Sequence, residues 1–207
     1  MKTIVYIDGF NFYYGAVKNT PYKWLDFSQL CRFLLPQNNI IKIKYFTALV
    51  TARPTDPDKT TRQQVYLRAL RTIPNLEIIR GHFLEHEVMM PLAGNTGGKQ
   101  QYARVIKTEE KGSDVNIAAH MINDGYKGLY ETAILISNDS DLVEPIKIVR
   151  NELKLPVGIL NPHDKPSNEL RKVASFIKPI RQGVLAASQF PLTLQDTRGT
   201  ITRPTTW

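Results

Sequence analysis

The chain has 207 residues, of which 42% are hydrophobic, and its formal net charge is +8. This size and composition fit one domain with a substantial core, and no apolar run approaches the roughly 20 residues of a membrane-spanning helix. The N-terminal stretch lacks the long apolar region and the cleavage site of a signal peptide, so we expect it to form the first core strand. The single Cys31 excludes an internal disulfide, and we expect a buried thiol in a reducing, cytoplasmic setting.

Strand-like and helix-like segments alternate along most of the chain, which is typical of βα units. Apolar runs predict strands at Thr3–Ile7, Ile41–Val50, Leu76–Phe83, Thr132–Ser137, Pro156–Leu160 and Ile177–Ile180. Helical patterns predict helices at Phe27–Leu34, Thr60–Thr72, Asp114–Asp124, Leu142–Glu152 and Ser167–Ala174. We therefore expect an α/β fold in three layers, α/β/α, around a mainly parallel central sheet of Rossmann-like type.

Two stretches do not follow this alternation. Between Glu87 and Lys99 the sequence is rich in Gly, Asn and Pro, and we expect a flexible loop that could cover a site. Gln101–Lys107 follows as a further strand candidate. From about Arg181 onward the sequence has no helical period, and we expect an extended or disordered tail. The expected organisation is a domain over residues 1–180 and a tail over residues 181–207.

Four aspartates stand where an α/β protein would place a divalent metal. Asp8 ends the first strand, Asp114 opens a helix, and Asp139 and Asp141 follow the strand Thr132–Ser137. Ligands of open α/β sheets bind beyond the carboxyl ends of the strands, so these side chains can converge. Two carboxylates about 4 Å apart repel by roughly 4 kcal/mol at an effective dielectric near 20. Mg²⁺ or Mn²⁺, which prefer carboxylate and water ligands, would offset that repulsion.

Helix capping is the alternative interpretation of each aspartate. Asp8 and Asp139 both suit the N-cap of a following helix, and Asp114 and Asp141 suit a first turn. A cap needs one polar residue, however, whereas the corner SNDSD contains five. This excess favours a functional site at the corner.

Other polar residues near these motifs have weaker assignments. Asn11 can bind a carboxylate or a phosphate. Lys111 can bind a phosphate or pair with a site carboxylate, and a solvated surface lysine is the equal alternative. Glu110 is a weaker candidate than Asp114, and for His120 we expect a structural or surface role. The sequence contains no phosphate-binding GxxxxGK[ST] loop and no GxSxG elbow.

Three motifs together resemble the NYN family of PIN-like domains. They are IDGFNFYYG, EEKGSDVNIAAHMI and ILISNDSDLVEPIKIV, in that order, and the resemblance spans roughly residues 1–180. The resemblance implies a fold similar to that of PIN and FLAP nucleases and a metal-dependent ribonuclease activity with one or two Mg²⁺ or Mn²⁺ ions. It implies site roles for Asp8, Asn11, Lys111, Asp114, Asp139 and Asp141.

The chain departs from the family pattern at three positions. Asn138 stands where a glycine is usual, and His120 and Ser175 stand where aspartate is common. Because the principal carboxylates are present, activity is still expected, with an altered rate or metal demand.

The expected reaction is hydrolysis of a phosphodiester bond by a water molecule that a metal ion activates. Arginine, lysine and tyrosine side chains are expected to contact the nucleic acid. These candidates are Arg62, Arg68, Arg71, Arg104, Lys107, Tyr13 and Tyr14. A solvated basic face and simple packing of the tyrosines are the alternatives.

The expected partner is RNA, in single-stranded form, and the sequence does not separate RNA from DNA. The rival functions are a DNA nuclease and a PIN-like regulatory module that binds RNA or a nucleotide without cutting it. We expect no membrane partner, and the oligomeric state, including a homo-oligomer, is left open.

Overall fold

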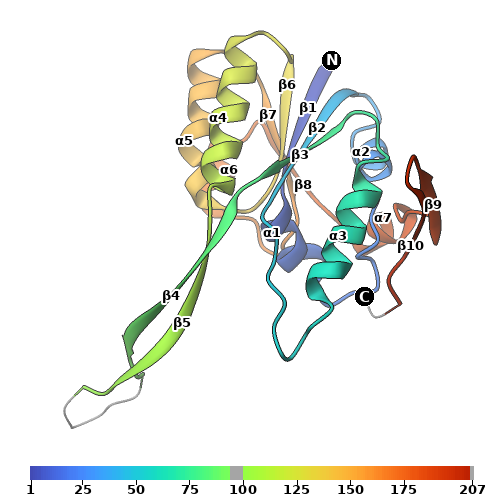
Figure 1. The fold of residues 1–207 in the computed structure, drawn as a ribbon. Coiled ribbons are helices and arrows are strands. Elements are labelled where there is room, and N and C mark those ends of the chain that lie inside the picture. Colours follow the sequence, from blue (N-terminus) through green and yellow to red (C-terminus); the bar gives the residue numbers. More distant parts are fainter. Residues whose placement is uncertain (94–99, 206–207) are drawn as a thin grey trace.

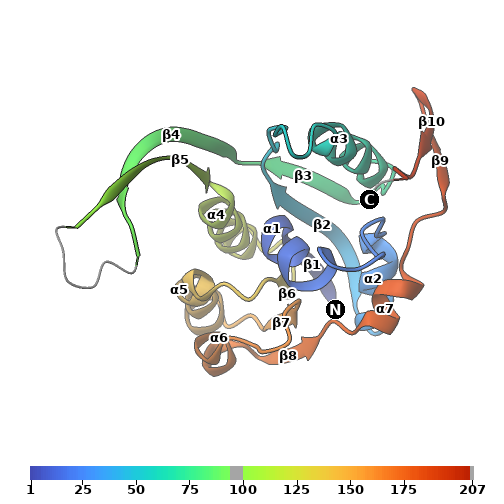
Figure 2. The ribbon, with the colours of Figure 1, turned by 90° about the horizontal axis from the view of Figure 1, so that it is seen from below.

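The structure is a computed structural model that describes residues 1–93 and 100–205. Its centre is a parallel sheet of six strands in the order β3-β2-β1-β6-β7-β8, with helices on both faces (Figures 1 and 2). These strands are β1 (Lys2–Asp8), β2 (Asn39–Thr47), β3 (Leu76–Arg80), β6 (Thr132–Ile136), β7 (Val157–Asn161) and β8 (Phe176–Pro179). The expected α/β/α fold of PIN-like type is therefore confirmed.

Helices flank the sheet in two layers. One layer contains α1 (Gly9–Phe12) with the π-helical turn η1 (Tyr13–Val17), α2 (Phe27–Leu34), α3 (Lys59–Leu70) and α7 (Gln182–Ala187). The other contains α4 (Ser113–Tyr126), α5 (Val143–Lys147) with the turns η2 (Ser140–Leu142) and η3 (Ile148–Glu152), and α6 (Asn168–Val173) (Figure 2). Within the described residues, no helix is both long enough and apolar enough to cross a bilayer.

The central strand β1 is buried because it supplies side chains to both layers. Successive residues of a strand point to opposite faces of the sheet. Ile7 packs in one apolar cluster with Phe27 of α2, whereas Tyr6 packs in the other with Met121 of α4. A strand buried on both faces is expected to be continuously apolar, which explains the uninterrupted run before Asp8.

The chain order of the strands reverses between β1 and β6. From β1 the chain proceeds outward to β2 and β3, and it then returns to β6, β7 and β8 on the other side. In open α/β sheets a crevice for ligands forms at such a switch point. Ile7 pairs with Ile136 in the register, so the residues that follow these two strands emerge side by side.

A long antiparallel hairpin projects from the body of the molecule (Figure 1). Its strands are β4 (His82–Pro91) and β5 (Tyr102–Lys111), so the strand expected at Gln101–Lys107 is present and longer. The prediction of a single strand at Leu76–Phe83 is wrong, because Gly81 separates two strands, β3 and β4. A side chain at Gly81 would collide with the carbonyl oxygen of Lys111, so glycine permits the base of the hairpin to pass close.

The prediction of a loop between Glu87 and Lys99 is also wrong in part. Residues 88–91 belong to β4, because β5 offers them a complete antiparallel ladder. Residues 94–99 lie outside the described residues.

The segment after residue 180 folds onto the domain, so the expectation of an extended or disordered tail is wrong for its described part. It forms α7 and a short hairpin of β9 (Thr193–Asp196) and β10 (Gly199–Thr202). Leu185, Phe190 and Ile201 are buried in the apolar cluster that contains β1 and α2. Burial of these three side chains against the body of the domain holds the segment in place.

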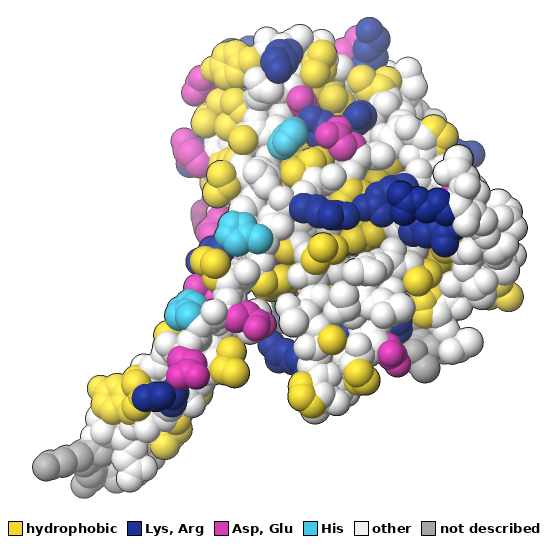
Figure 3. All heavy atoms as spheres, in the orientation of Figure 1, with side chains coloured by type: hydrophobic (Ala, Val, Ile, Leu, Met, Phe, Trp, Pro, Cys, Tyr) yellow, Lys and Arg dark blue, Asp and Glu magenta, His cyan; other side chains and the backbone are white. Residues whose placement is uncertain are grey.

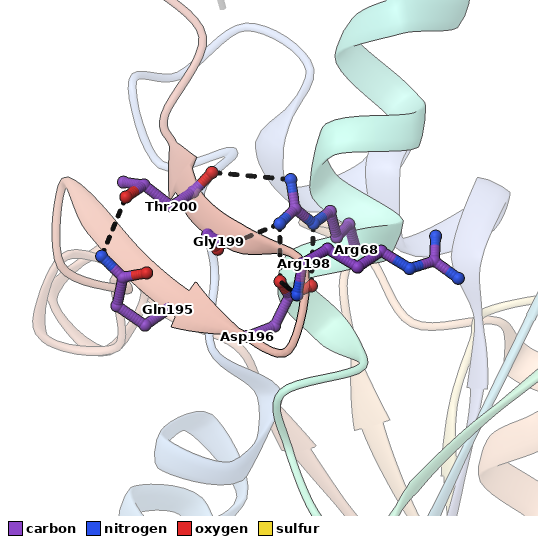
Figure 4. Close-up of polar contacts among 6 residues, drawn as sticks. All are labelled: Arg68, Gln195, Asp196, Arg198, Gly199 and Thr200. Atoms are coloured by element: carbon purple, nitrogen blue, oxygen red, sulfur yellow. Dashed lines mark hydrogen bonds and ion pairs between the residues drawn. The ribbon is translucent and has the colours of Figure 1, made fainter.

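Arg68 of α3 forms hydrogen bonds to the C-terminal hairpin of β9 and β10 (Figure 4). Its Nε and Nη2 atoms donate to the two carboxylate oxygens of Asp196 at 2.8 and 2.5 Å. Nη2 also donates to the carbonyl oxygen of Gly199 at 3.0 Å. A bidentate arginine–carboxylate pair of this kind fixes geometry as well as charge, so Arg68 has a structural role in this fold.

Candidate metal centre

Three carboxylates meet at the carboxyl end of the sheet, where β1, β6 and α4 come together. Asp8 is the last residue of β1, Asp139 follows β6, and Asp114 lies in the first turn of α4. One oxygen from each carboxylate lies within 4.8 Å of an oxygen from each of the other two. Asp8 is buried, and Asp114 and Asp139 are partly exposed, so a small ligand can reach this acidic cluster from solvent.

The hairpin and a sharp turn bring Asp114 to the cluster. Gly112, between β5 and α4, has a φ of 99°, in the left-handed region that favours glycine. The hydroxyl of Ser113 donates to the carboxylate of Glu110 at 2.9 Å. Burial raises the pKa of Asp114, and the charges of Asp139 and Glu110 raise it further. Glu110 therefore lies at the margin of the cluster.

Asp8 is the most strongly perturbed member of the cluster. Burial raises the pKa of Asp8 from 3.8 to about 6, and the charges of Asp114 and Asp139 add to the rise. Hydrogen bonds from the backbone amide of Asn11, at 2.9 Å, and from the hydroxyl of Ser137, at 3.1 Å, oppose it. At neutral pH the surroundings of Asp8 therefore disfavour its negative charge, and a bound cation would offset this electrostatic cost.

The capping role of these aspartates is present as well. Asp8 accepts the amide of Asn11 in α1, and Asp139 accepts the amide of Asp141 at 3.0 Å. An ionised carboxylate has about four lone-pair sites, so a capping bond leaves acceptor capacity for another ligand. The caps fix the orientation of the carboxylates, and the two interpretations do not exclude each other.

The donor set fits Mg²⁺ or Mn²⁺. These hard cations prefer carboxylate and water oxygens, and Mg²⁺ commonly keeps several water molecules while using one or two carboxylates. In the described part of the chain, the cluster contains no histidine and no cysteine, the ligands that structural and catalytic zinc sites usually include. Asp8, Asp114 and Asp139 are the residues that could hold the ion.

Asp141 and Lys111 lie beside this trio and not within it. Asp141 is exposed in η2. The pKa of Asp114 is raised first by burial, then by the charges of Asp139 and Glu110, and least by the charge of Asp141. Lys111 ends β5, and its exposed ammonium lies 3.4 Å from the carboxylate of Glu109. Asp141 is placed to interact with a ligand at the rim, whereas Lys111 is engaged at the base of the hairpin.

Asn11 connects two segments that are remote in sequence. Its Oδ1 accepts the amide of Asn138 at 2.9 Å and lies 3.1 Å from Nε2 of His163. Ser137 joins the same region, because its hydroxyl donates to Asp8 and accepts the amide of Asp139 at 3.1 Å. Sequence reasoning did not select Ser137 or His163 as site residues. Ser137 could have been found from its place in the polar corner, but nothing in the sequence pointed to His163.

His120 takes no part in the cluster. Its Nδ1 lies 3.0 Å from the ammonium of Lys44, which also pairs with Asp124 at 2.5 Å. The hydroxyl of Tyr6 donates to the same carboxylate at 2.8 Å. Burial and the charge of Lys44 lower the pKa of His120. This polar network ties β1 and β2 to α4, which agrees with the structural role expected for His120.

Most of the basic side chains expected to contact nucleic acid have acidic partners. The pairs are Arg62 with Asp56, Arg68 with Asp196, Arg104 with Glu87 and Lys107 with Glu109. Arg71 is exposed, and within the described residues it forms no ion pair. Desolvation and then the charges of Arg80 and Arg198 lower the pKa of Arg71, so these three cations lie near one another. Figure 3 shows basic side chains in a row across this face of the molecule.

A cavity of about 280 Å³ lies beside α1. We call it the α1–α3 cavity, because α1, η1, the end of β2 and α3 supply its walls. Gly9, which follows Asp8, lines it together with Tyr13 and Tyr14, two of the expected nucleic-acid contacts. The rings of Tyr13 and Tyr14 meet edge to face with centroids 5.3 Å apart.

Comparisons with known proteins agree with this architecture. The chain is 30% identical to 6-hydroxy-3-succinoylpyridine 3-monooxygenase HspA of Pseudomonas putida, over an alignment that covers 100% of this chain and 75% of that protein. A solved structure of a protein of unknown function from Vibrio parahaemolyticus, VPA0982, has the same fold, with a TM-score of 0.57 and 17% identity over 87% of this chain and 93% of the other. The model of the NYN domain matches residues 2–181. The chain therefore belongs to the NYN domain family.

Proposed function

We propose that this protein is a metal-dependent nuclease that hydrolyses phosphodiester bonds in single-stranded RNA. The observation that carries the proposal is the convergence of Asp8, Asp114 and Asp139, with ligand oxygens within 4.8 Å of one another. Membership of the NYN domain family, whose fold resembles that of PIN nucleases, supports the same activity.

The chemistry follows from the roles open to these side chains. A Mg²⁺ or Mn²⁺ ion held there would lower the pKa of a water molecule and neutralise charge on the phosphate. Asp8 and Asp139 approach from adjacent strand ends, and their capping bonds hold the carboxylates in fixed orientations. Asp141 at the exposed rim can orient the attacking water or accept its proton.

Positive charge outside the cluster favours a polyanionic substrate. The net charge of +8 coexists with an acidic centre, so a basic surface can attract the nucleic acid while the metal centre cuts it. The exposed cations Arg71, Arg80 and Arg198, which lie near one another, offer such a basic surface.

The relative HspA suggests a second candidate function. Its name describes a monooxygenase that acts on a pyridine derivative, and the α1–α3 cavity has room for one aromatic ring. The acidic cluster argues against oxygenase chemistry at this centre, since non-haem iron oxygenases usually bind iron with two histidines and one carboxylate. The described cluster consists of aspartates, and hydrolysis is therefore the function that the geometry supports best.

The test is a cleavage assay on labelled single-stranded RNA and on single-stranded DNA of the same sequence, with Mn²⁺, Mg²⁺ or EDTA. We expect RNA cleavage that needs a divalent ion and is lost in Asp139→Asn but retained in Asp164→Asn, an exposed control. Cutting of DNA alone would contradict the RNA assignment. If neither polymer is cut under any metal while 6-hydroxy-3-succinoylpyridine is consumed with oxygen and an added electron donor, the nuclease proposal fails.

A further inference from the structure

The α1–α3 cavity begins directly beside the metal-binding candidates. Gly9, which follows Asp8 in the chain, lines the cavity, and so does Tyr45. Burial raises the pKa of the Tyr45 phenol, and the charge of nearby Asp8 raises it further. β1 and β2 are neighbours in the sheet, so the cavity and the acidic cluster occupy adjacent strand ends. A ligand in the cavity can therefore extend to the cluster.

The walls of the cavity are aromatic. Among the described residues, six aromatic ones line it: Phe10, Phe12, Tyr13, Tyr14, Tyr45 and Tyr66. Aromatic walls of this kind stack on planar rings. The volume of about 280 Å³ is at the low end of small-molecule sites, which begin near roughly 300 Å³. It suits one ring system and not an extended chain.

One lining residue, Arg62, has a buried polar atom without a partner among the described residues. The Nη2 atom of Arg62 donates to both carboxylate oxygens of Asp56, at 2.6 and 2.7 Å. Its Nε atom is buried and has no acceptor among the described residues. A buried donor without an acceptor is uncommon, and a ring nitrogen or exocyclic carbonyl of a bound heterocycle would satisfy it.

A second hollow continues from the cavity to the base of the projecting hairpin. It shares Phe10, Tyr14, Val50 and Lys59 with the α1–α3 cavity and extends to Glu110 at the base of the hairpin. The charge of Glu110 contributes to the raised pKa of Asp114, after burial and Asp139, so this end of the hollow approaches the metal candidates. The hydroxyl of Ser113, the residue before Asp114, donates to Glu110 at 2.9 Å, so the two adjoining hollows together reach the neighbourhood of the candidate metal centre.

We propose that the α1–α3 cavity binds one unpaired nucleobase of the RNA, next to the phosphate that is cut. The proposal rests on the proposed nuclease function and adds the element that would select single-stranded RNA. A base held in a duplex cannot enter such a cavity, because it is stacked and paired. Since Asp56 already neutralises Arg62, the cavity favours a neutral ring over a phosphate. Lys23 and Lys59, at its margin, can contact the adjoining phosphates.

The first test measures the binding of single nucleosides without metal. Adenosine and uridine are titrated into the protein in EDTA, with ribose and nicotinate as comparison ligands, and binding is followed by amide chemical shifts. We expect a nucleoside to shift the amides of Gly9, Tyr14 and Gln63, whereas ribose does not. Tyr14→Ala should weaken binding by about fivefold or more, since stacking on one aromatic contributes about 1–3 kcal/mol per base, and Arg62→Lys should weaken it because lysine lacks the buried Nε donor.

Matched controls separate the cavity from general effects on the fold. Tyr14 is 57% exposed and Tyr126 is 61% exposed, so Tyr126→Ala removes a comparable side chain outside the cavity. Arg32→Lys is the control for Arg62→Lys, because Arg32 is exposed on α2 and does not line the cavity. Equal nucleoside affinity in the cavity variants and the controls, or no shift at the cavity amides, would overturn the proposal. Tighter binding of nicotinate than of either nucleoside would also overturn it.

The second test distinguishes failure of this inference from failure of the nuclease function. RNA oligonucleotides that carry one abasic position, placed in turn along the chain, are cut in Mn²⁺. We expect an abasic position next to a cleavage site to reduce cutting at that site by about fivefold or more. Cleavage that is indifferent to every abasic position would overturn the base-binding proposal and leave the nuclease function standing. Nucleoside binding at the cavity without any cleavage would retain the ring site and reject the nuclease function.

Discussion

Replacing Asp8 by asparagine is expected to stabilise the metal-free protein at alkaline pH. The pKa of Asp8 rises from 3.8 to about 6 in the folded protein, a difference of about 2 units. Because the folded state binds the proton more tightly than the unfolded state, ionisation destabilises the fold. At about 1.4 kcal/mol per unit, this effect is on the order of 3 kcal/mol above pH 6, and it is absent below pH 4.

Asparagine removes this charge and keeps most of the local structure. It caps helices about as well as aspartate, so the bond from the Asn11 amide can persist. Its amide group cannot replace both carboxylate oxygens, and the hydrogen bond from Ser137 is then lost or weakened at a cost of about 1 kcal/mol. We expect a net gain of about 2 kcal/mol at pH 8 in EDTA and a small loss at pH 4.

Urea unfolding at pH 4 and pH 8 checks this prediction. With a denaturant slope of about 2 kcal/mol per molar, the midpoint of Asp8→Asn should lie about 1 M above that of the wild type at pH 8. Asp141→Asn is the control, since Asp141 is exposed, and its midpoint should change little. Saturating Mn²⁺ should stabilise the wild type by about 2.7 kcal/mol at 100 times the dissociation constant and the variant by much less. An Asp8→Asn midpoint at or below the wild-type midpoint at pH 8 in EDTA would refute the reasoning.

Three further predictions follow from other parts of the structure. The apparent affinity for Mn²⁺ should weaken as the pH falls through about 6, since a metal ligand must be deprotonated and Asp8 has a pKa of about 6 in the metal-free protein; an Mn²⁺ affinity that is the same at pH 5 and pH 8 would exclude Asp8 as a ligand. Asp124→Asn should destabilise the fold by about 3–5 kcal/mol in urea, because it leaves the buried ammonium of Lys44 unpaired; a loss below 1 kcal/mol would contradict that. Phe190→Ala should cost about 3–5 kcal/mol, because Phe190 packs against Trp24 in the core, whereas a disordered tail would give no change.

The sequence predicted the sheet because its strands are short, apolar and bounded by clear breaks. A strand buried on both faces has no polar residue until it reaches the edge of the sheet, as in the run that ends at Asp8. In a parallel sheet the carboxyl ends of all strands lie at one edge, so the convergence of Asp8 and Asp139 could be foreseen from their positions. The approach of Asp114 could be foreseen as well, from the helix that it opens.

The first strand of the projecting hairpin, its pairing with β5 and the folding of the C-terminal segment could not be foreseen in the same way. β4 and β5 are partly exposed along both faces, so they lack the clean alternation of a half-buried strand. In the C-terminal segment, Leu185, Phe190 and Ile201 are spaced without a period, and only tertiary contacts with the core bury them.

The groups that support the site come from remote positions. The bond between Asn11 and the Asn138 amide spans 127 residues, and the contact between Asn11 and His163 spans 152. The α1–α3 cavity combines Tyr13, Tyr45 and Arg62 from three elements. Local pattern carries no information on such pairings, because they depend on how the elements pack.

The most direct test of the central claim, that the three carboxylates form one metal site, is a titration with Mn²⁺ followed by electron paramagnetic resonance of the free ion. We expect saturable binding by the wild type that weakens by about 10-fold or more in Asp139→Asn and in Asp114→Asn. Loss of an outer supporting group alone commonly costs about 10–100-fold. Asp164→Asn should bind as the wild type does. Equal Mn²⁺ affinity in the wild type and both cluster variants would contradict the account.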